Sequence, residues 1–273
     1  MRVKELAAFI KERESIRVQK DKGLPPPWTK DPILGTYRFC NVHREDDRVS
    51  RWLRKEWYPN FKNNEDMWFT AVVARLLNLP ASLDAVQPCI LPWRSEEFRE
   101  TLQTRAEEGE KNFNAAYIVS TNGKSIDKVD YITDYILDVL WADRERLRPG
   151  KKDTLFVYHQ LLMGYDGLGS FMAAQIVADL KYLPPLKKAS DWWTFAASGP
   201  GSRRGLNRVV GYDPKAPWKE TEWHYTLMRL REQINPLLSE PLHAQDLQNC
   251  LCEFDKYERA RLGEGKPKQL YRP

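Results

Sequence analysis

Apolar residues along most of the chain recur at spacings of three and four positions, which is the period of an α-helix. Ile132, Ile136 and Leu140, for example, fall on one face of such a helix. Alternation with a period of two, typical of a half-buried β-strand, is nearly absent. We therefore expect an all-α fold. The pattern predicts helices over residues 3–14, 46–57, 65–78, 95–108, 126–147, 153–163, 170–182, 189–197, 219–235 and 241–262.

The length of 273 residues is enough for one large domain or two small ones. No internal repeat or low-complexity stretch divides the chain. We expect a single helical domain over 1–273 whose halves flank a cleft, with an N-terminal helix and linker over 1–27. The basic tail over 263–273 is expected to be a loop, and either contact with DNA or disorder would explain its composition.

Composition excludes several classes of protein. Hydrophobic residues make up 42% and charged residues 30%, which is typical of a folded soluble protein. No apolar run approaches the ~20 residues of a membrane helix, and the N-terminus lacks the pattern of a secretory signal. We expect a cytoplasmic protein with no membrane partner. The four cysteines do not make a disulfide framework, and Cys250-x-Cys252 has no companion pair, so we expect no metal site.

The net charge of +5 does not by itself indicate a nucleic-acid partner. Arginine and lysine concentrate around 38–55, 181–208 and 256–272, whereas acids dominate 95–110 and parts of 220–255. A basic face opposed to an acidic one suits a polyanionic ligand. Ordinary solvated helix surfaces would also explain each cluster taken alone.

A glycine turn joins two predicted helices in GYDGLGSFMAAQIVADL. One helix should end at Met163 and the next should begin at Ser170, with Gly167 and Gly169 between them. Glycine permits positive φ and a close approach of the backbone to a ligand, and the new helix N-terminus offers N–H groups to a phosphate oxygen. This is the layout of a helix-hairpin-helix element, which holds a DNA backbone. An ordinary turn between antiparallel helices is the alternative.

The segment KKASDWW follows this hairpin. In helix-hairpin-helix DNA glycosylases an aspartate at a similar interval lies at the mouth of the base pocket, and Asp191 resembles it. An N-terminal helix cap is the other interpretation of Asp191. Lys187 and Lys188 are candidate DNA contacts, and Trp192 or Trp193 is a candidate to stack on an extruded base.

Two further segments are rich in charge. SGPGSRRGLNR predicts a flexible loop in which backbone N–H groups and the guanidinium groups of Arg203, Arg204 and Arg208 clamp phosphate or pyrophosphate; Asn207 lies among them. A surface loop with incidental arginines is the alternative. No GxxxxGK[ST] P-loop occurs, so a nucleotide-driven kinase is not expected.

RFCNVHREDDRVSR, at 38–51, crowds ionisable groups before an apolar helix. This density indicates a buried ion-pair network or a substrate site. His43 is either a general base or a hydrogen-bonding residue at a helix start. The other candidate substrate contacts are Arg38, Asn41, Arg44 and Asp47 here, and Asn249, Glu253 and Lys256 on one helical face of DLQNCLCEFDKY.

RFCNVHREDDRVSRWL, SGPGSRRGLNR and DLQNCLCEFDKY, in this order over residues 28–262, resemble the helical domain of bacteriophage 5-hydroxymethyluracil DNA kinases. They resemble more closely the alpha-glutamyl/putrescinyl thymine pyrophosphorylases, also called amino acid:DNA transferases. That family is similar in fold to the helix-hairpin-helix DNA glycosylases. A kinase of this group carries a P-loop domain, whose motif is absent here.

The resemblance implies hypermodification of phage DNA in an infected bacterial cell. A free amino acid, such as glycine, or a polyamine would displace pyrophosphate from 5-pyrophosphoryloxymethyluracil in double-stranded DNA, with the target base flipped out. No cofactor is implied, and a need for Mg²⁺ with the pyrophosphate stays open. The amine donor and the oligomeric state also stay open.

Roles within that reaction are hypotheses. Asp191 or His43 would take the proton that the donor ammonium must lose. The arginines of 198–208 would stabilise the leaving pyrophosphate, and Arg38 or Arg44 would bind a donor carboxylate. Asn41 and Asn249 are candidates for reading the uracil edge.

Two other functions are compatible with these motifs. A helix-hairpin-helix DNA glycosylase would use Asp191 to excise a modified base, and a non-catalytic module would bind modified DNA beside a kinase. The density of ionisable residues in 38–51 and 199–208 favours the enzyme.

Overall fold

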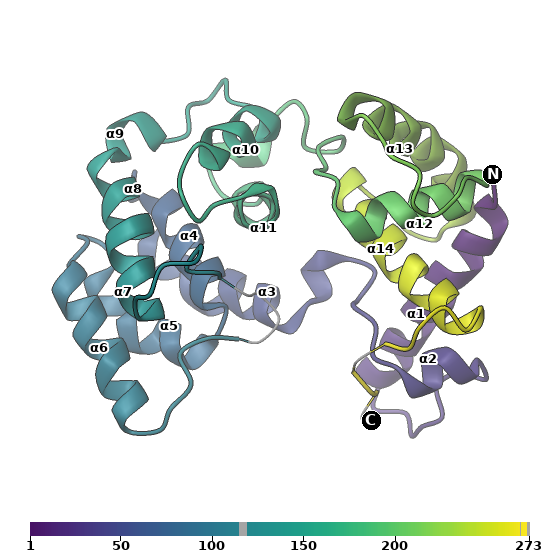
Figure 1. Cartoon of the computed structure of the whole chain (residues 1–273), viewed down its shortest axis with the longest axis horizontal. Coiled ribbons are helices and arrows are strands. Elements are labelled where there is room, and N and C mark those ends of the chain that lie inside the picture. The colour runs from purple at the N-terminus through teal and green to yellow at the C-terminus, as the bar shows by residue number, and fades with distance from the viewer. Residues whose placement is uncertain (115–118, 268, 272–273) are drawn as a thin grey trace. The chain divides into compact units, whose positions relative to one another are not determined.

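The computed structural model describes residues 1–114, 119–267 and 269–271 (Figure 1). Regular structure in these residues is helical, and their β-type pairing is limited to an isolated bridge between Tyr37 and Leu270. The all-α prediction is confirmed. Helix content does not by itself identify a helix-hairpin-helix glycosylase fold, which stays a prediction.

The helices have the following bounds. The longer ones are α1 (Val3–Asp21), α4 (Met67–Leu77), α6 (Ser95–Glu107), α10 (Leu155–Met163), α11 (Ser170–Leu180), α12 (Pro200–Val210), α13 (Glu220–Ile234) and α14 (Ala244–Arg261). The shorter ones are α2 (Pro32–Thr36), α3 (Arg48–Trp52), α5 (Pro80–Val86), α7 (Lys128–Asp130), α8 (Asp138–Ala142) and α9 (Arg144–Leu147). Wider π-helical turns extend α3 over Leu53–Trp57 and join α7 to α8 over Tyr131–Leu137.

The helix predicted over 189–197 is wrong, because this segment consists of turns and of residues without regular secondary structure. Its apolar residues Phe195 and Ala196 are buried although they lie outside a helix. The carboxylate of Asp191 accepts hydrogen bonds from the amides of Leu155 (2.8 Å) and Phe156 (2.9 Å), so it caps α10 rather than a helix of its own.

The flexible loop predicted over 198–208 is also wrong, because most of it forms α12. Pro200 occupies the first turn, where its fixed φ favours a helix. The amide of Gly199 donates to the hydroxyl of Ser202 at 3.0 Å and closes the N-terminus. Backbone N–H groups in the body of this helix bond within it, so any backbone contact to an anion is limited to the first turn of α12, and the predicted anion clamp stays a prediction.

Two glycines of α12 allow it to pack closely on α14. A Cβ at Gly205 would lie 2.0 Å from the carbonyl oxygen of Leu251, and a Cβ at Gly201 would lie 2.4 Å from the sulfur of Cys252. Any side chain at Gly205 would therefore push the two backbones apart. The glycine-rich composition serves helix packing rather than loop flexibility.

Packing divides the chain into two compact units, residues 1–47 with 193–273 (unit 1) and residues 48–192 (unit 2). The expectation of one domain over 1–273 stays a prediction. In Figure 1, unit 1 contains α1, α2, α12, α13 and α14, and unit 2 contains α3 to α11. No helix in the described part of the chain has the length and apolar character needed to cross a membrane.

Both ends of the chain contribute to unit 1. Helix α1 extends beyond its predicted end and buries Leu6, Phe9 and Ile10 in the core with α13 and α14. The expected loose tail is attached where it is described, since the amide of Tyr271 donates to the carbonyl of Thr36 at 2.8 Å. Residues 268 and 272–273 of that tail lie outside the described residues.

In unit 2 a buried ion pair fastens α4 to α11. The Nε and Nη2 atoms of Arg75 lie 2.5 and 2.6 Å from the two carboxylate oxygens of Asp179. The hydroxyl of Tyr58 also donates to Asp179, at 3.0 Å. All three side chains are buried, so this network holds the second helix of the hairpin to the core.

Candidate functional site

The segment 38–47 lies along α14 and is fastened to it by hydrogen bonds. The amide of Cys40 donates to the carboxylate of Glu253 at 2.9 Å, and the amide of Arg44 donates to the carboxylate of Asp246 at 3.1 Å. The side chain of Asn249 donates to the carbonyl of Asn41 at 3.2 Å. Since α12 packs on the same helix, the three motifs that are far apart in the sequence meet at α14 (Figure 1).

At the N-terminus of α14, two histidines share one buried carboxylate. Nδ1 of His43 lies 3.4 Å from Oδ2 of Asp246, and Nε2 of His243 lies 3.0 Å from the same oxygen. Nδ1 of His243 accepts the amide of Asp246 at 3.2 Å, which places the proton of neutral His243 on Nε2. Asp246 is 3% exposed, so its charge is held inside the unit by these donors.

His43 is oriented and made more basic by this carboxylate. The hydrogen bond to Asp246 raises the pKa of His43 above its ordinary value of 6.5, while burial lowers it; the charges of Asp246, Glu14 and Glu240 raise it further. With the proton of Nδ1 directed at Asp246, Nε2 carries the lone pair. Nε2 lies 3.7 Å from the exposed carboxylate of Glu240. This is the arrangement of a general base held by a buried acid.

A pocket of about 160 Å³ lies beside His43. It is formed by one face of α1, by Val42 and His43, and by the 238–242 segment after α13. Both charged and apolar side chains line it, so it offers a small ligand charge as well as hydrophobic contact. His43 was predicted from its segment, whereas the residues of α1 were not, because no local sequence pattern links α1 to residue 43.

A second cluster on α14 is built from arginines. The buried carboxylate of Asp255 accepts Nε of Arg204 at 2.8 Å and Nε of Arg208 at 2.9 Å, and Nε of Arg259 lies 3.5 Å away. Arg208 also pairs with Glu264. The side chains of Arg204 and Arg259 are 35% and 41% exposed. The hydrogen bond from Nε anchors Arg204 to Asp255, whereas Arg259 forms an ion pair with the same carboxylate. Arg259 was not predicted.

The two clusters occupy opposite faces of α14. Asp246 and Asp255 are nine positions apart, which corresponds to about 13.5 Å along the axis and two and a half turns of an ideal helix. The helix itself therefore separates His43 from the Asp255 arginines. One reacting group cannot be in contact with both.

The other residues predicted in α12 have partners within unit 1. The guanidinium group of Arg203 donates to Ser198, to the carbonyl of Trp218 at 3.1 Å and to Glu220 at 2.7 Å. Asn207 is fully buried. Its side-chain nitrogen donates to the carbonyls of Pro214 and Ala216, and its side-chain oxygen accepts the indole N–H of Trp218. Asn207 is thus a structural residue of the 214–218 loop.

The remaining predicted substrate contacts lie in the 38–47 segment or, for Lys256, on α14 beside it. The side chain of Asn41 donates to the carbonyl of Asp46 at 2.8 Å. Lys256 pairs with Glu253 at 2.7 Å and lies 4.6 Å from the centre of the Phe39 ring. Arg38 and Asp47 are exposed.

The hairpin of unit 2 has the predicted boundaries, since α10 ends at Met163 and α11 begins at Ser170. Gly167 has φ of +76°, and a Cβ there would lie 2.5 Å from Cδ1 of Ile136, so both backbone conformation and space require glycine. Gly169 precedes the first turn of α11. The prediction of a tight glycine turn between two helices is confirmed; its contact with DNA stays a prediction.

The residues predicted after the hairpin belong to unit 2 as far as Trp192, and Trp193 belongs to unit 1. Lys187 and Lys188 are exposed in a short 3-10 turn. The indole of Trp192 donates to the carbonyl of Lys181 at 2.7 Å, and the Lys181 ammonium lies 3.8 Å from the ring centre. In unit 1, Trp193 is 47% exposed. Of the two tryptophans, Trp193 is the more accessible.

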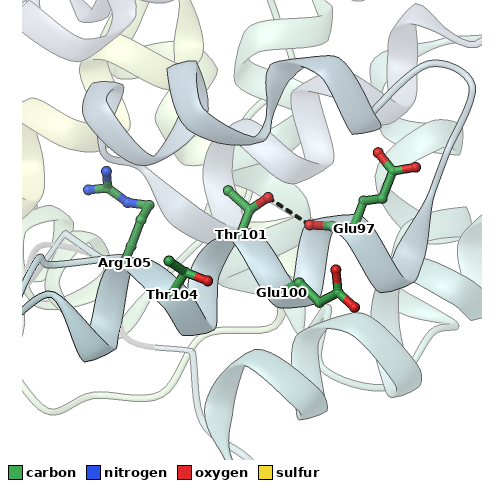
Figure 2. A pocket seen from close by; sticks show the side chains of 5 residues that line it. All are labelled: Glu97, Glu100, Thr101, Thr104 and Arg105. Atoms are coloured by element: carbon green, nitrogen blue, oxygen red, sulfur yellow. Dashed lines mark hydrogen bonds between the residues drawn. The ribbon is translucent and has the colours of Figure 1, made fainter.

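A shallow depression on the surface of α6 differs from the His43 pocket, because a single helix forms it. Figure 2 shows that its five side chains come from one face of one helix. Thr101 donates to the carbonyl of Glu97 at 2.7 Å, which is a bond within the helix. The lining residues are Glu97, Glu100, Thr101, Thr104 and Arg105.

The cysteines and the possible metal ligands were compared with the needs of a nucleophilic thiol and of a metal site. Burial raises the pKa of Cys89 and Cys250 to about 11, so these thiols are protonated at neutral pH and are poor nucleophiles. No three His, Cys, Asp or Glu side chains among the described residues are grouped as metal ligands.

Comparison with known proteins agrees with the motifs at α14. The family model of the 5-hmdU DNA kinase helical domain matches residues 2–267. A 5-hmdU DNA kinase of Bacillus phage SP10 is 26% identical over 221 residues, which cover 72% of this chain and 34% of the kinase. The chain therefore spans about a third of the length of this curated relative. No solved structure matches the chain significantly. The predicted relationship to the kinase helical domain is confirmed, and the closer resemblance to the pyrophosphorylases stays a prediction.

Proposed function

This chain belongs to the family of the 5-hmdU DNA kinase helical domain, and from that premise we propose that it is a phage DNA-modifying transferase. Its substrate is DNA that carries pyrophosphorylated 5-hydroxymethyluracil, made by a separate kinase reaction. A free amine attacks the exocyclic methylene, a C–N bond forms, and the C–O bond breaks with its electron pair leaving on pyrophosphate. One proton of the donor ammonium goes to a general base before attack, and a second is lost to water afterwards.

The observation that carries this proposal is the His43–Asp246 pair beside a pocket. An amine is a nucleophile only after its ammonium has lost a proton, and the lone pair on Nε2 of His43 is suited to accept it. The raised pKa of His43 strengthens it as a base near neutral pH. Both carboxylate oxygens of Asp191, by contrast, accept amides of α10. His43 is therefore the base of this proposal.

The arginines around Asp255 take a different role from the predicted one. Because α14 separates them from His43, we assign Arg204 and Arg259 to phosphates of the DNA backbone rather than to the leaving pyrophosphate. Arg204, whose Nε binds Asp255, keeps its outer N–H groups for an oxyanion, and Arg259 forms an ion pair with the same carboxylate. The hairpin glycines and Lys187 and Lys188 are candidates for further backbone contacts, with the target base flipped out of the duplex.

The test is direct product analysis. The protein is incubated with duplex DNA bearing 5-pyrophosphoryloxymethyluracil and a mixture of amino acids and polyamines, and the digested nucleosides are identified by mass spectrometry. The proposal expects a nucleoside with the mass of an amine adduct, together with released pyrophosphate. Release of a free base with an abasic site would instead identify a DNA glycosylase. Tight binding to the DNA with an unchanged nucleoside profile would identify a binding module.

A further inference from the structure

The pocket beside His43 has an aliphatic wall. Five apolar side chains contribute to its lining, and the pocket of about 160 Å³ is well below the ~300 Å³ at which pockets for drug-sized ligands begin. Its ligand is therefore small, and part of that ligand is a hydrocarbon. The apolar lining residues are Ile10, Val18, Val42, Leu238 and Leu242.

The charged residues around this wall favour a cation. Glu14 and Glu240 line the pocket, and among the described lining residues the permanent cations are Lys11 and Arg17. Arg17 already pairs with three carboxylates. These belong to Glu14, to Asp21 at 2.9 Å and to Asp46 at 3.1 Å. The positive charge of Arg17 is thus more than neutralised by its own partners, and Asp246 adds a further negative charge behind His43.

Glu14 also has an unused acceptor. Its Oε1 binds Arg17, whereas its Oε2 is buried and has no hydrogen-bond partner among the described residues. A buried carboxylate oxygen without a donor is unfavourable. An ammonium group has three N–H donors and no acceptor, so it satisfies such an oxygen and matches its charge.

We infer that this pocket binds the amine donor and that the donor is an aliphatic diamine or polyamine rather than an amino acid. One ammonium binds Oε2 of Glu14, the methylene chain covers the apolar wall, and the second nitrogen gives its proton to Nε2 of His43. This inference rests on the proposed function, and it specifies the class of donor at the same site.

An amino acid matches the pocket less well for two reasons. Its carboxylate would lie among acidic groups, with Lys11 as the remaining cation of the lining because Arg17 is already paired. Glycine, in addition, has no chain of methylenes to cover the apolar wall. Both differences act on binding, so they are measurable without DNA.

Calorimetric titration of the full chain with putrescine (1,4-diaminobutane), glycine and glutamate tests the pocket. We expect putrescine to bind and the two amino acids not to bind under the same conditions. Glu14→Gln should weaken putrescine binding by about tenfold or more, the usual size for a hydrogen bond to a charged group. Glu240→Gln, at an exposed site that cannot disturb folding, should weaken it by about threefold. Glu5→Gln, at the other end of α1, is the matched control and should leave binding unchanged.

Transfer assays separate this inference from the proposed function. An adduct formed with putrescine and reduced by Glu14→Gln supports both. An amino-acid adduct without a putrescine adduct would overturn the inference and leave the transferase standing, as would a putrescine adduct that Glu14→Gln does not change. Putrescine binding that Glu14→Gln weakens, with no adduct from any amine, would overturn the transferase while the pocket remains a diamine site.

Discussion

Two aspartates on α14 are both buried, and their surroundings differ. Asp246, which is 3% exposed, faces two histidines beside a pocket. Asp255, which is 1% exposed, faces three arginines. Each carboxylate needs donors to offset its loss of hydration. The donors decide what each site can do.

Histidine and arginine respond differently to a buried carboxylate. The hydrogen bond to Asp246 raises the pKa of His43 above its ordinary value of 6.5, and a histidine can exchange its proton with a ligand. Arginine stays charged, so Asp255 fixes the position of Arg204 and Arg208 without changing their protonation. The first cluster is suited to acid–base chemistry and the second to holding an anion. Three experiments test this contrast, and a fourth tests the packing of α12 on α14 that positions the arginines.

The largest effect is expected from His43→Ala. Loss of a general base slows a reaction by about 10²–10⁴-fold, so amine transfer should fall by this factor while binding of substrate DNA is retained. The measurement is the initial rate of adduct formation by mass spectrometry. His224→Ala removes a histidine of the same unit that bonds the carbonyl of Thr194 at 2.7 Å, and it should leave the rate unchanged. Activity retained in His43→Ala would place the base elsewhere.

A large effect on stability is expected from Gly205→Ala. The added Cβ would meet the backbone of Leu251 at 2.0 Å, and overpacking of this kind costs about 1–3 kcal/mol or more. Urea denaturation measures the loss. Gly199→Ala is the control, because no atom lies within 4 Å of its Cβ and its φ is −139°. Its cost is limited to the poorer N-cap preference of alanine, about 1 kcal/mol or less, so it should destabilise the protein less than Gly205→Ala. Equal stability of the two variants would contradict the close packing of α12 on α14.

These glycines also explain why sequence reasoning was wrong about 198–208. Glycine next to serine and arginine favours a loop when only local propensity is considered. The structure uses Gly201 and Gly205, one turn apart, for a contact with a helix some fifty residues away in the sequence. Similarly, the apolar spacing of 189–197 reflects burial of Phe195 in a non-helical segment. Long amphipathic helices such as α13 and α14 were predictable because their period is local.

The candidate site was predictable only in part for the same reason. His43 and Asp246 each lie in a segment that is conspicuous for its ionisable residues, so the segments were found. Their pairing spans about two hundred positions, and the participation of α1 through Glu14 has no local signal. Asp191 was likewise identified from its position after the hairpin. Its hydrogen bond to the amide of Leu155 at the start of α10 was not predictable from that position.

A moderate effect is expected from Arg204→Gln and Arg259→Gln. If these arginines contact backbone phosphates, each variant should weaken binding of plain and pyrophosphorylated DNA alike and reduce the slope of log K against log salt by about one. Lys219→Gln removes an exposed positive charge of the same unit as the control. Loss of affinity for pyrophosphorylated DNA alone would mean that the Asp255 cluster holds the leaving group. His43, on the opposite face of α14, would then not be the base.

The smallest effect, and the one most specific to the histidine site, is expected from Glu240→Gln. The Glu240 carboxylate lies 3.7 Å from Nε2 of His43 and helps to raise its pKa above 6.5. A base must be unprotonated, so kcat should rise with pH and level off above the pKa of His43. Removing one exposed negative charge lowers that pKa, and the midpoint should move to lower pH by about 0.2–0.5 unit. The pH profile of kcat for the two proteins measures the shift, with Glu5→Gln as the control. A midpoint that stays fixed or moves to higher pH would mean that a group other than His43 controls the profile, because loss of a neighbouring anion can only lower the pKa of a histidine.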